Sequence, residues 1–198
     1  FWKGEERGVR VSRCLRFILM VLAGLLALAT LAMAGEPVRV AVIVAQTGIA
    51  TTNNAGGLRG SLLAAEEINA AGGVLGRPLE LLVLDNQSTP LGSRQAAREA
   101  VATGVTAVLG PFWSSHSLAA APELQAAGVP MVSPQATNPR VTKVGNYIFR
   151  TCFNDDFQGR LMARFARQRL RATTAAVLTI MDEDYSLFLG KVFAEAFK

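Results

Sequence analysis

The feature that most constrains the fold is an alternation, from residue 38 onward, between short apolar segments and longer amphipathic segments. Val38–Val44 reads VRVAVIV, which is short and β-branched and is therefore typical of a buried strand. Gly56–Ala71 instead places Leu58, Leu62 and Ile68 on one stripe, which is typical of a helix. Apolar strands that alternate with helices predict an α/β fold, with a parallel sheet covered by helices on both faces.

Glycines and prolines between the segments set the expected boundaries. The expected strands are Val38–Val44, Leu79–Leu84, Thr106–Leu109, Val129–Val132, the short extended piece Tyr147–Arg150, and Ala175–Ile180. The expected helices are Gly56–Ala71, Pro90–Thr103, Ser115–Ala127, Asp155–Leu170 and Ser186–Phe197. Ligands of such sheets bind beyond the carboxyl ends of the strands. The loops there are Ala45–Ala55, Asp85–Thr89, Gly110–Ser115, Ser133–Pro139 and Met181–Ser186.

The N-terminal region has the pattern of an export signal. Residues 17–34 read FILMVLAGLLALATLAMA without a charge, follow Arg10, Arg13 and Arg16, and end on the A-x-A pattern Ala32-Met33-Ala34. We therefore expect residues 1–34 to be a cleaved signal peptide, in which residues 1–10 can be upstream sequence because the first residue is Phe. The alternative is a membrane anchor, for which eighteen apolar residues are at the short limit. Cleavage predicts a soluble mature protein outside the cytoplasm.

Composition argues against several functional classes. The formal net charge is +5, but residues 1–34 carry five basic and two acidic side chains, which leaves only +2 for the rest. No Lys- and Arg-rich cluster with aromatic residues follows residue 35, so nucleic acid is not an expected partner. His116 is the single histidine, and Cys152 would be the single cysteine after signal cleavage, so neither a metal site nor an internal disulfide is expected. The glycine-rich fingerprints of dinucleotide and nucleotide sites are absent, and no cofactor is expected.

The loop Gly110–Ser117 reads GPFWSSHS and precedes an expected helix. Ser114 and Ser115 there fit two readings: an ordinary helix cap, or a site where hydroxyls and free N–H groups bind an anion. A catalytic pair of a serine with His116 is disfavoured, because neighbours at a helix start rarely face each other and no G-x-S-x-G turn is present.

Two further loops supply polar or aromatic groups at the same edge. Ser133–Pro139 reads SPQATNP, a turn in which the Thr137 hydroxyl can donate and accept hydrogen bonds. Tyr185 follows the acidic run Asp182–Asp184 and offers an amphipathic ring.

Together these segments resemble the branched-chain amino-acid-binding proteins, the leucine/isoleucine/valine type of periplasmic ABC-transporter receptor. The residues that carry the resemblance are Val40–Gly48 (VAVIVAQTG), Ala64–Gly73 (AAEEINAAGG), Gly110–Ser117, Ser133–Pro139, and Phe149–Thr151 with Gln158 and Gly159. They span nearly all of residues 38–198 and occur in the order of the family.

The resemblance implies a ligand-binding site. Ser114 and Thr137 would hold the α-carboxylate, and the backbone carbonyl of Gln135 would accept from the ammonium. Tyr185 matches an aromatic residue that closes over the ligand from the opposite lobe. Ser115 and Ala136 are counted with the site as neighbours in the same loops. The sequence departs from the family at Asn53, where many relatives have an aromatic residue, which leaves the side-chain specificity open; Trp113 stands where some have a disulfide cysteine.

The resemblance also implies the organisation and function. Residues 35–154 would form a Rossmann-like first lobe, and residues 155–198 would begin a second lobe whose ammonium-binding acid lies beyond Lys198. The expected protein is not an enzyme: it captures a small amino acid by hinge closure and delivers it to an ABC-transporter permease. Alternatives are a ligand-sensing receptor domain, a binder of amides, urea or aromatic acids, and an exported α/β enzyme.

Overall fold

A computed structural model describes residue 20 and residues 35–198. The predicted signal segment 1–34 lies outside the described residues, apart from residue 20. Within the described part of the chain, no helix combines the length and the apolar character needed to cross a membrane.

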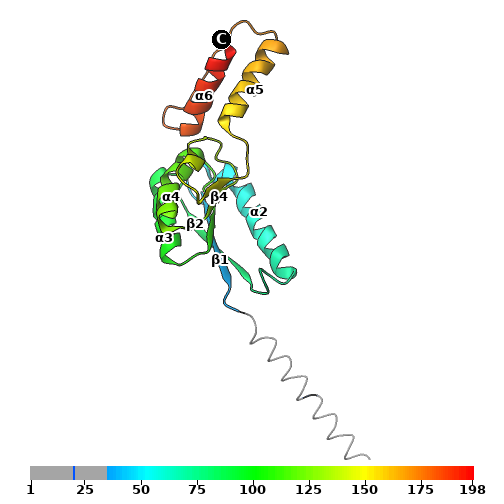
Figure 1. Ribbon diagram of the computed structural model, residues 1–198, viewed down its shortest axis with the longest axis vertical. Coiled ribbons are helices and arrows are strands. Elements are labelled where there is room, and N and C mark those ends of the chain that lie inside the picture. Colours follow the sequence, from blue (N-terminus) through cyan, green and yellow to red (C-terminus); the bar gives the residue numbers. More distant parts are fainter. Residues whose placement is uncertain (1–19, 21–34) are drawn as a thin grey trace, which may run out of the picture.

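The centre of the fold is a parallel sheet of five strands in the order β2-β1-β3-β4-β5 (Figure 1). The strands are β1 (Val38–Val44), β2 (Leu79–Asp85), β3 (Ala107–Leu109), β4 (Met131–Ser133) and β5 (Ile148–Arg150). The helices are α2 (Thr51–Ala70), α3 (Pro90–Ala102), α4 (Ser114–Ala127), the short 3-10 turn η1 (Val141–Lys143), α5 (Asp155–Gln168) and α6 (Asp184–Phe197). All four strand pairs are parallel, so the carboxyl ends of the strands share one edge. The predicted α/β fold is confirmed.

Helices cover both faces of this sheet. On one face α3 and α4 pack over a core that includes Ile43, Val108, Leu124 and Met131, all at most 1% exposed. On the other face, α2 packs over Val42, Val44 and Phe112 through Leu58 (Figure 1). The central strand β1 is buried on both sides, which explains its uninterrupted apolar sequence.

Local signals fix several helix ends as expected. Thr89 caps α3 by accepting from the Gly92 N–H, and Pro90 follows at the first helical position. Gly128 ends α4 in the left-handed conformation, at φ 68°. Helix α2 begins at Thr51, five residues before the predicted Gly56. Its first turn is fixed by tertiary contacts, because buried Asn54 accepts from the Ala45 N–H.

The predicted strand Ala175–Ile180 is wrong. These residues form no strand and pair with none of the five described strands. A strand is defined by ladder hydrogen bonds to a neighbour. The end of this segment instead bonds to the start of α6: the Ile180 N–H donates to Ser186 Oγ at 2.8 Å, and the Ile180 carbonyl accepts from the Glu183 N–H at 3.4 Å.

Helices α5 and α6 form a pair that lies beyond the carboxyl edge of the sheet (Figure 1). They approach closely at Gly159, where a β-carbon would lie 2.7 Å from Val192 Cγ1. The start of α6 contacts α4, so the pair faces the loops that were predicted to bind ligand.

Candidate functional site

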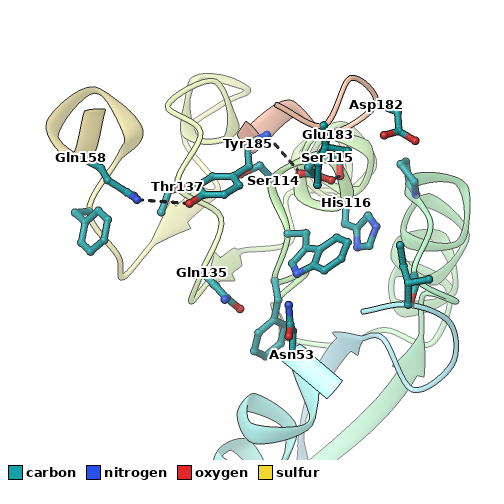
Figure 2. A pocket seen from close by; sticks show the side chains of 17 residues that line it. Asn53, Ser114, Ser115, His116, Gln135, Thr137, Gln158, Asp182, Glu183 and Tyr185 are labelled. Atoms are coloured by element: carbon teal, nitrogen blue, oxygen red, sulfur yellow. Dashed lines mark hydrogen bonds between the residues drawn. The ribbon is translucent and has the colours of Figure 1, made fainter. Parts of the chain in front are cut away.

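A cavity of about 600 Å³ lies where the sheet's carboxyl edge faces the start of α6 (Figure 2). The first four loops and α5 and α6 all contribute to its wall. The lining residues are Ile49, Asn53, Ser88, Pro90, Phe112, Trp113, Ser114, Ser115, His116, Gln135, Thr137, Phe153, Gln158, Ile180, Asp182, Glu183 and Tyr185.

Six of the seven predicted site residues line this one cavity: Asn53, Ser114, Ser115, Gln135, Thr137 and Tyr185. The seventh, Ala136, is fully buried and does not line it. Its N–H donates to Ser133 Oγ at 3.1 Å, and its carbonyl accepts from Arg150 Nη1 at 2.9 Å. Ala136 therefore fixes the loop rather than facing the cavity. That the other six bind a ligand stays a prediction.

The serines at the start of α4 are not its cap. The N-cap residue is Trp113, which makes no side-chain cap hydrogen bond. Ser114 Oγ instead accepts from the Asn138 N–H at 3.2 Å, and Ser115 Oγ donates to Glu183 Oε2 at 2.8 Å. Among the described residues, no acceptor is assigned to the N–H groups of Ser114, Ser115 and His116, and the helix dipole favours negative charge at this end.

The backbone carbonyls of the loop after β4 differ in whether another residue of the chain donates a hydrogen bond to them. The Thr137 carbonyl accepts from the Asp155 N–H at 3.0 Å, and the Ala136 carbonyl is bound by Arg150. Among the described residues, no donor is assigned to the Gln135 carbonyl. It remains available to a donor in the cavity.

Asp155 is a buried acid at a position where the sequence indicates only the start of a helix. It is fully buried next to Thr137, and among the described residues neither carboxylate oxygen has a hydrogen-bond partner with good distance and angle. The Thr137 hydroxyl is also buried without a partner. Burial raises the pKa of the Asp155 carboxyl, an effect that the nearby Thr137 hydroxyl and the Arg150 guanidinium partly offset. An acid in a first helical turn is so ordinary that its sequence gives no signal of this isolation.

His116 lies in the cavity wall and is held there by Asn86 and Trp113. Asn86 Oδ1 accepts from the Ser88 N–H, which directs the Asn86 Nδ2 group to His116 Nδ1 at 3.3 Å. In this arrangement the Asn86 amide donates and His116 Nδ1 accepts. Burial lowers the pKa of His116, although Glu183 and the Ser88 backbone oppose that shift. The ring stacks on Trp113 at 5.3 Å and so supports that side chain in the cavity wall.

The charges that line the cavity are all negative. Asp182 and Glu183 are its charged residues, and no Lys or Arg is among the lining residues. Glu183 also caps α6 by accepting from the Tyr185 N–H, so its carboxylate lies between the starts of α4 and α6. Within residues 35–198, no group of three His, Cys, Asp or Glu residues could hold a metal ion.

The position of the Phe112 ring in the cavity wall depends on one glycine of α2. The Phe112 ring lies in the wall and packs directly against Gly57. A β-carbon at Gly57 would overlap the ring, so α2 and Phe112 can lie this close only because residue 57 has no side chain.

A sequence model of the family described as "Periplasmic binding protein" matches residues 37–198. The chain belongs to the periplasmic binding protein family. The leucine-, isoleucine-, valine-, threonine-, and alanine-binding protein of Pseudomonas aeruginosa is 35% identical over 177 residues, which are 89% of this chain and 45% of that protein. The Leu/Ile/Val-binding protein BraC3 of Rhizobium johnstonii is 34% identical over 70% of this chain and 37% of its own length.

Solved structures of periplasmic binding proteins are also similar to this chain. The leucine binding protein LivK of Thermotoga maritima is 39% identical with a TM-score of 0.76, over 81% of this chain and 45% of that one. LivJ of Streptococcus pneumoniae, solved with isoleucine, is 31% identical with a TM-score of 0.78, over 82% of this chain and 47% of that one. The resemblance to branched-chain amino-acid-binding proteins is thus confirmed. The chain spans less than half the length of each of these relatives.

Proposed function

We propose that the protein is an exported solute-binding protein that captures a small apolar amino acid and delivers it to an ABC-transporter permease. It performs no chemistry on the ligand. Residues 35–154 act as the first lobe and residues 155–198 begin the second, with closure between them enclosing the ligand. Relatives whose names state binding of leucine, isoleucine and valine support this ligand class.

The observation that carries the proposal is the pairing of opposite hydrogen-bonding sets in one cavity. Ser114 and the N–H groups of α4 offer donors to a carboxylate. The unpartnered Gln135 carbonyl offers an acceptor to an ammonium in the same cavity, and the Asp155 carboxyl, which does not line the cavity, lies next to the Thr137 hydroxyl. A zwitterion satisfies both sets, whereas a simple acid or a simple amine satisfies only one.

The rest of the wall favours an apolar ligand side chain. Ile49, Phe112, Trp113 and Phe153 line the cavity, and Tyr185 enters from α6. The two acids Asp182 and Glu183 would repel a ligand with a second carboxylate. Asn53 lines the cavity where many relatives have an aromatic residue, so the side-chain specificity is open and aromatic amino acids belong in the same screen as leucine, isoleucine and valine.

The test is a binding screen of the full-length mature protein by thermal shift and calorimetry. L-Leucine is compared with 4-methylpentanoate, which lacks the ammonium, and 3-methylbutylamine, which lacks the carboxylate. We expect the amino acid to bind and both analogues to fail. A ligand present at a hundred times its Kd should stabilise the protein by about 2.7 kcal/mol.

Ser114→Ala should weaken amino-acid binding by roughly tenfold or more, since it removes one donor to a charged group. Ser61→Ala is the matched control, because the Ser61 hydroxyl bonds only the Gly57 carbonyl of its own helix. Equal binding of the amino acid and of 4-methylpentanoate would contradict the zwitterion site. Turnover of small esters or amides that is lost in Ser114→Ala would contradict the non-catalytic role.

A further inference from the structure

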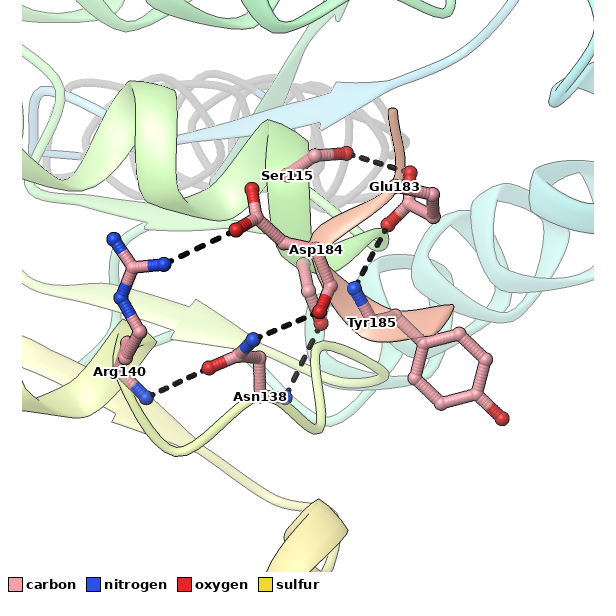
Figure 3. A network of polar contacts seen from close by, with 7 residues as sticks. Ser115, Asn138, Arg140, Glu183, Asp184 and Tyr185 are labelled. Carbon is pink, nitrogen blue, oxygen red and sulfur yellow. Dashed lines mark hydrogen bonds and ion pairs between the residues drawn. The ribbon is translucent and has the colours of Figure 1, made fainter. Parts of the chain in front are cut away.

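Three polar contacts join the start of α6 to the two loops that carry the predicted ligand contacts (Figure 3). Ser115 Oγ donates to Glu183 Oε2 at 2.8 Å. Asn138 Nδ2 donates to the Asp184 carbonyl at 3.0 Å, and Arg140 Nη1 lies 3.2 Å from Asp184 Oδ1. These contacts span 44 to 68 positions in the sequence, so they hold two separate parts of the chain together.

Asn138 is the most buried of the three residues that reach α6 from the loops, at 1% exposed. Its Nδ2 group binds the Asp184 carbonyl, and its Oδ1 accepts from the Arg140 N–H at 3.0 Å. Its own N–H donates to Ser114 Oγ at 3.2 Å. One buried residue therefore touches the predicted ligand serine, the turn that carries Arg140, and the start of α6.

The bond to Ser114 also sets the direction of that hydroxyl. A hydroxyl has one hydrogen to donate and can accept with its lone pairs. Because Ser114 Oγ already accepts from Asn138, its hydrogen remains free for an acceptor in the cavity. This orientation is the one that a bound carboxylate requires.

We propose that Asn138 is a positioning residue that couples the donor role of Ser114 to closure of the start of α6 over the cavity. The inference rests on the proposed function, in which closure retains the ligand. Tyr185 follows directly after the bonded Asp184 and lines the cavity, so contact through Asn138 also sets the place of that ring. Loss of the contact should let α6 leave the cavity without altering lobe one.

An asparagine is needed because its two side-chain groups have opposite roles. Asn138→Asp keeps an oxygen for the Arg140 N–H but places an acceptor against the Asp184 carbonyl, so it breaks the α6 bond selectively. Asn146→Asp is the matched control. Its Oδ1 accepts from Gln125 Nε2 at 3.0 Å on the surface of lobe one, and the same exchange leaves that bond in place.

The experiment uses the full-length protein and two readouts. Hydrogen exchange of the ligand-free protein follows the peptide over residues 182–187, and stopped-flow fluorescence follows release of L-leucine. Asn138→Asp should raise exchange at 182–187 about tenfold and raise the dissociation rate about tenfold, with little change in the association rate. Asn146→Asp should match the wild type. Asn138→Ala, which adds no charge, should reproduce both effects and so exclude simple repulsion.

Wild-type exchange and dissociation rates in both Asn138 variants would overturn the inference. Exchange that rises throughout β1 and β4 as well would also overturn it, because the residue would then only stabilise lobe one. A wild-type protein that binds none of the amino acids defeats the proposed function instead. The ligand-free exchange still decides the contact with α6 in that case.

Discussion

Two aspartates at the same edge of the sheet have opposite surroundings. Asp85 ends β2, and its Oδ1 accepts from the N–H groups of Gln46, Thr47 and Gln87 at 2.8 to 3.3 Å. Its Oδ2 accepts from the Thr47 hydroxyl at 2.6 Å. Asp155, after β5, is fully buried, and within residues 35–198 neither of its oxygens has a hydrogen-bond partner with good distance and angle. Both oxygens of Asp85 therefore accept hydrogen bonds from neighbouring loops, whereas the oxygens of Asp155 are buried next to Thr137 without such bonds.

The pKa values of the two groups move in opposite directions for this reason. Burial raises the pKa of Asp85, but its hydrogen bonds from Thr47, Gln87 and Gln46 outweigh that effect and leave the pKa below the ordinary 3.8. Burial raises the pKa of Asp155 above the same value, with too few opposing contacts to cancel it. The comparison separates a carboxylate whose hydrogen bonds favour its charged form in the folded protein from one whose burial disfavours that form.

The largest effect is expected from Asp85→Ala. The substitution leaves three backbone N–H groups of two loops without their acceptor, and should lower the free energy of unfolding by about 2–3 kcal/mol. Urea denaturation of the full-length protein at pH 7 measures it. Glu80→Ala, which removes an exposed pair with Arg39, is the control and should change stability by well under about 1 kcal/mol. Equal losses in both variants would contradict the special role of Asp85.

The contributions of Asp85 and Asp155 to the free energy of unfolding should change with pH in opposite directions. A lowered folded pKa means that Asp85 contributes stability above 3.8, and that this contribution is lost as pH falls below it. A raised folded pKa means that Asp155 lowers stability as pH rises above 3.8 toward its folded value. Urea titrations across this range should show a shallower acid loss in Asp85→Asn and no Asp155-dependent decline in Asp155→Asn.

An intermediate effect is expected from Asp155→Asn. Removing a buried charge whose burial Thr137 and Arg150 offset only in part should raise the free energy of unfolding at pH 7 by about 1 kcal/mol. Binding of an amino acid should weaken by roughly tenfold, because the amide no longer attracts an ammonium. Calorimetry and urea denaturation of the same samples check both signs. A variant that loses stability and keeps its affinity would show that Asp155 is structural, as Asp85 is.

The smallest effect is expected from Thr47→Val. It removes the single hydroxyl bond to Asp85 Oδ2 and keeps the side-chain shape and the three N–H bonds. The free energy of unfolding should fall by about 0.5 kcal/mol at pH 7, and the pKa of Asp85 should rise. NMR titration of the Asp85 carboxyl measures the shift. An unchanged pKa would mean that the backbone donors alone control this group.

Much of the fold followed from the sequence because strand and helix periodicity is local. All five observed strands lie within or within a residue or two of predicted segments. The error at Ala175–Ile180 arose because an apolar run predicts a strand only if a neighbour is there to pair with it. The early start of α2 was missed because Asn54 is fixed by Ala45, a contact that no helical periodicity records.

The candidate site likewise combines features that could be predicted from the sequence with features that could not. The loops that line the cavity followed from their place after parallel strands, which brought Ser114, Thr137 and Gln135 together. The contacts of Glu183 and Asn138 could not be predicted, since their partners lie 68 and 46 positions away. The isolation of Asp155 could not be predicted either, because burial without a partner depends on three-dimensional packing alone.

The contact of Gly57 with Phe112 has a consequence for how ligand size can change. The ring is part of the cavity wall, yet what limits its position is a residue of α2 behind it. A methyl group added at Gly57 would push the aromatic ring away from α2 without exchanging any side chain that a ligand touches. Related sequences can therefore differ in the depth of this cavity while every residue that lines it stays the same.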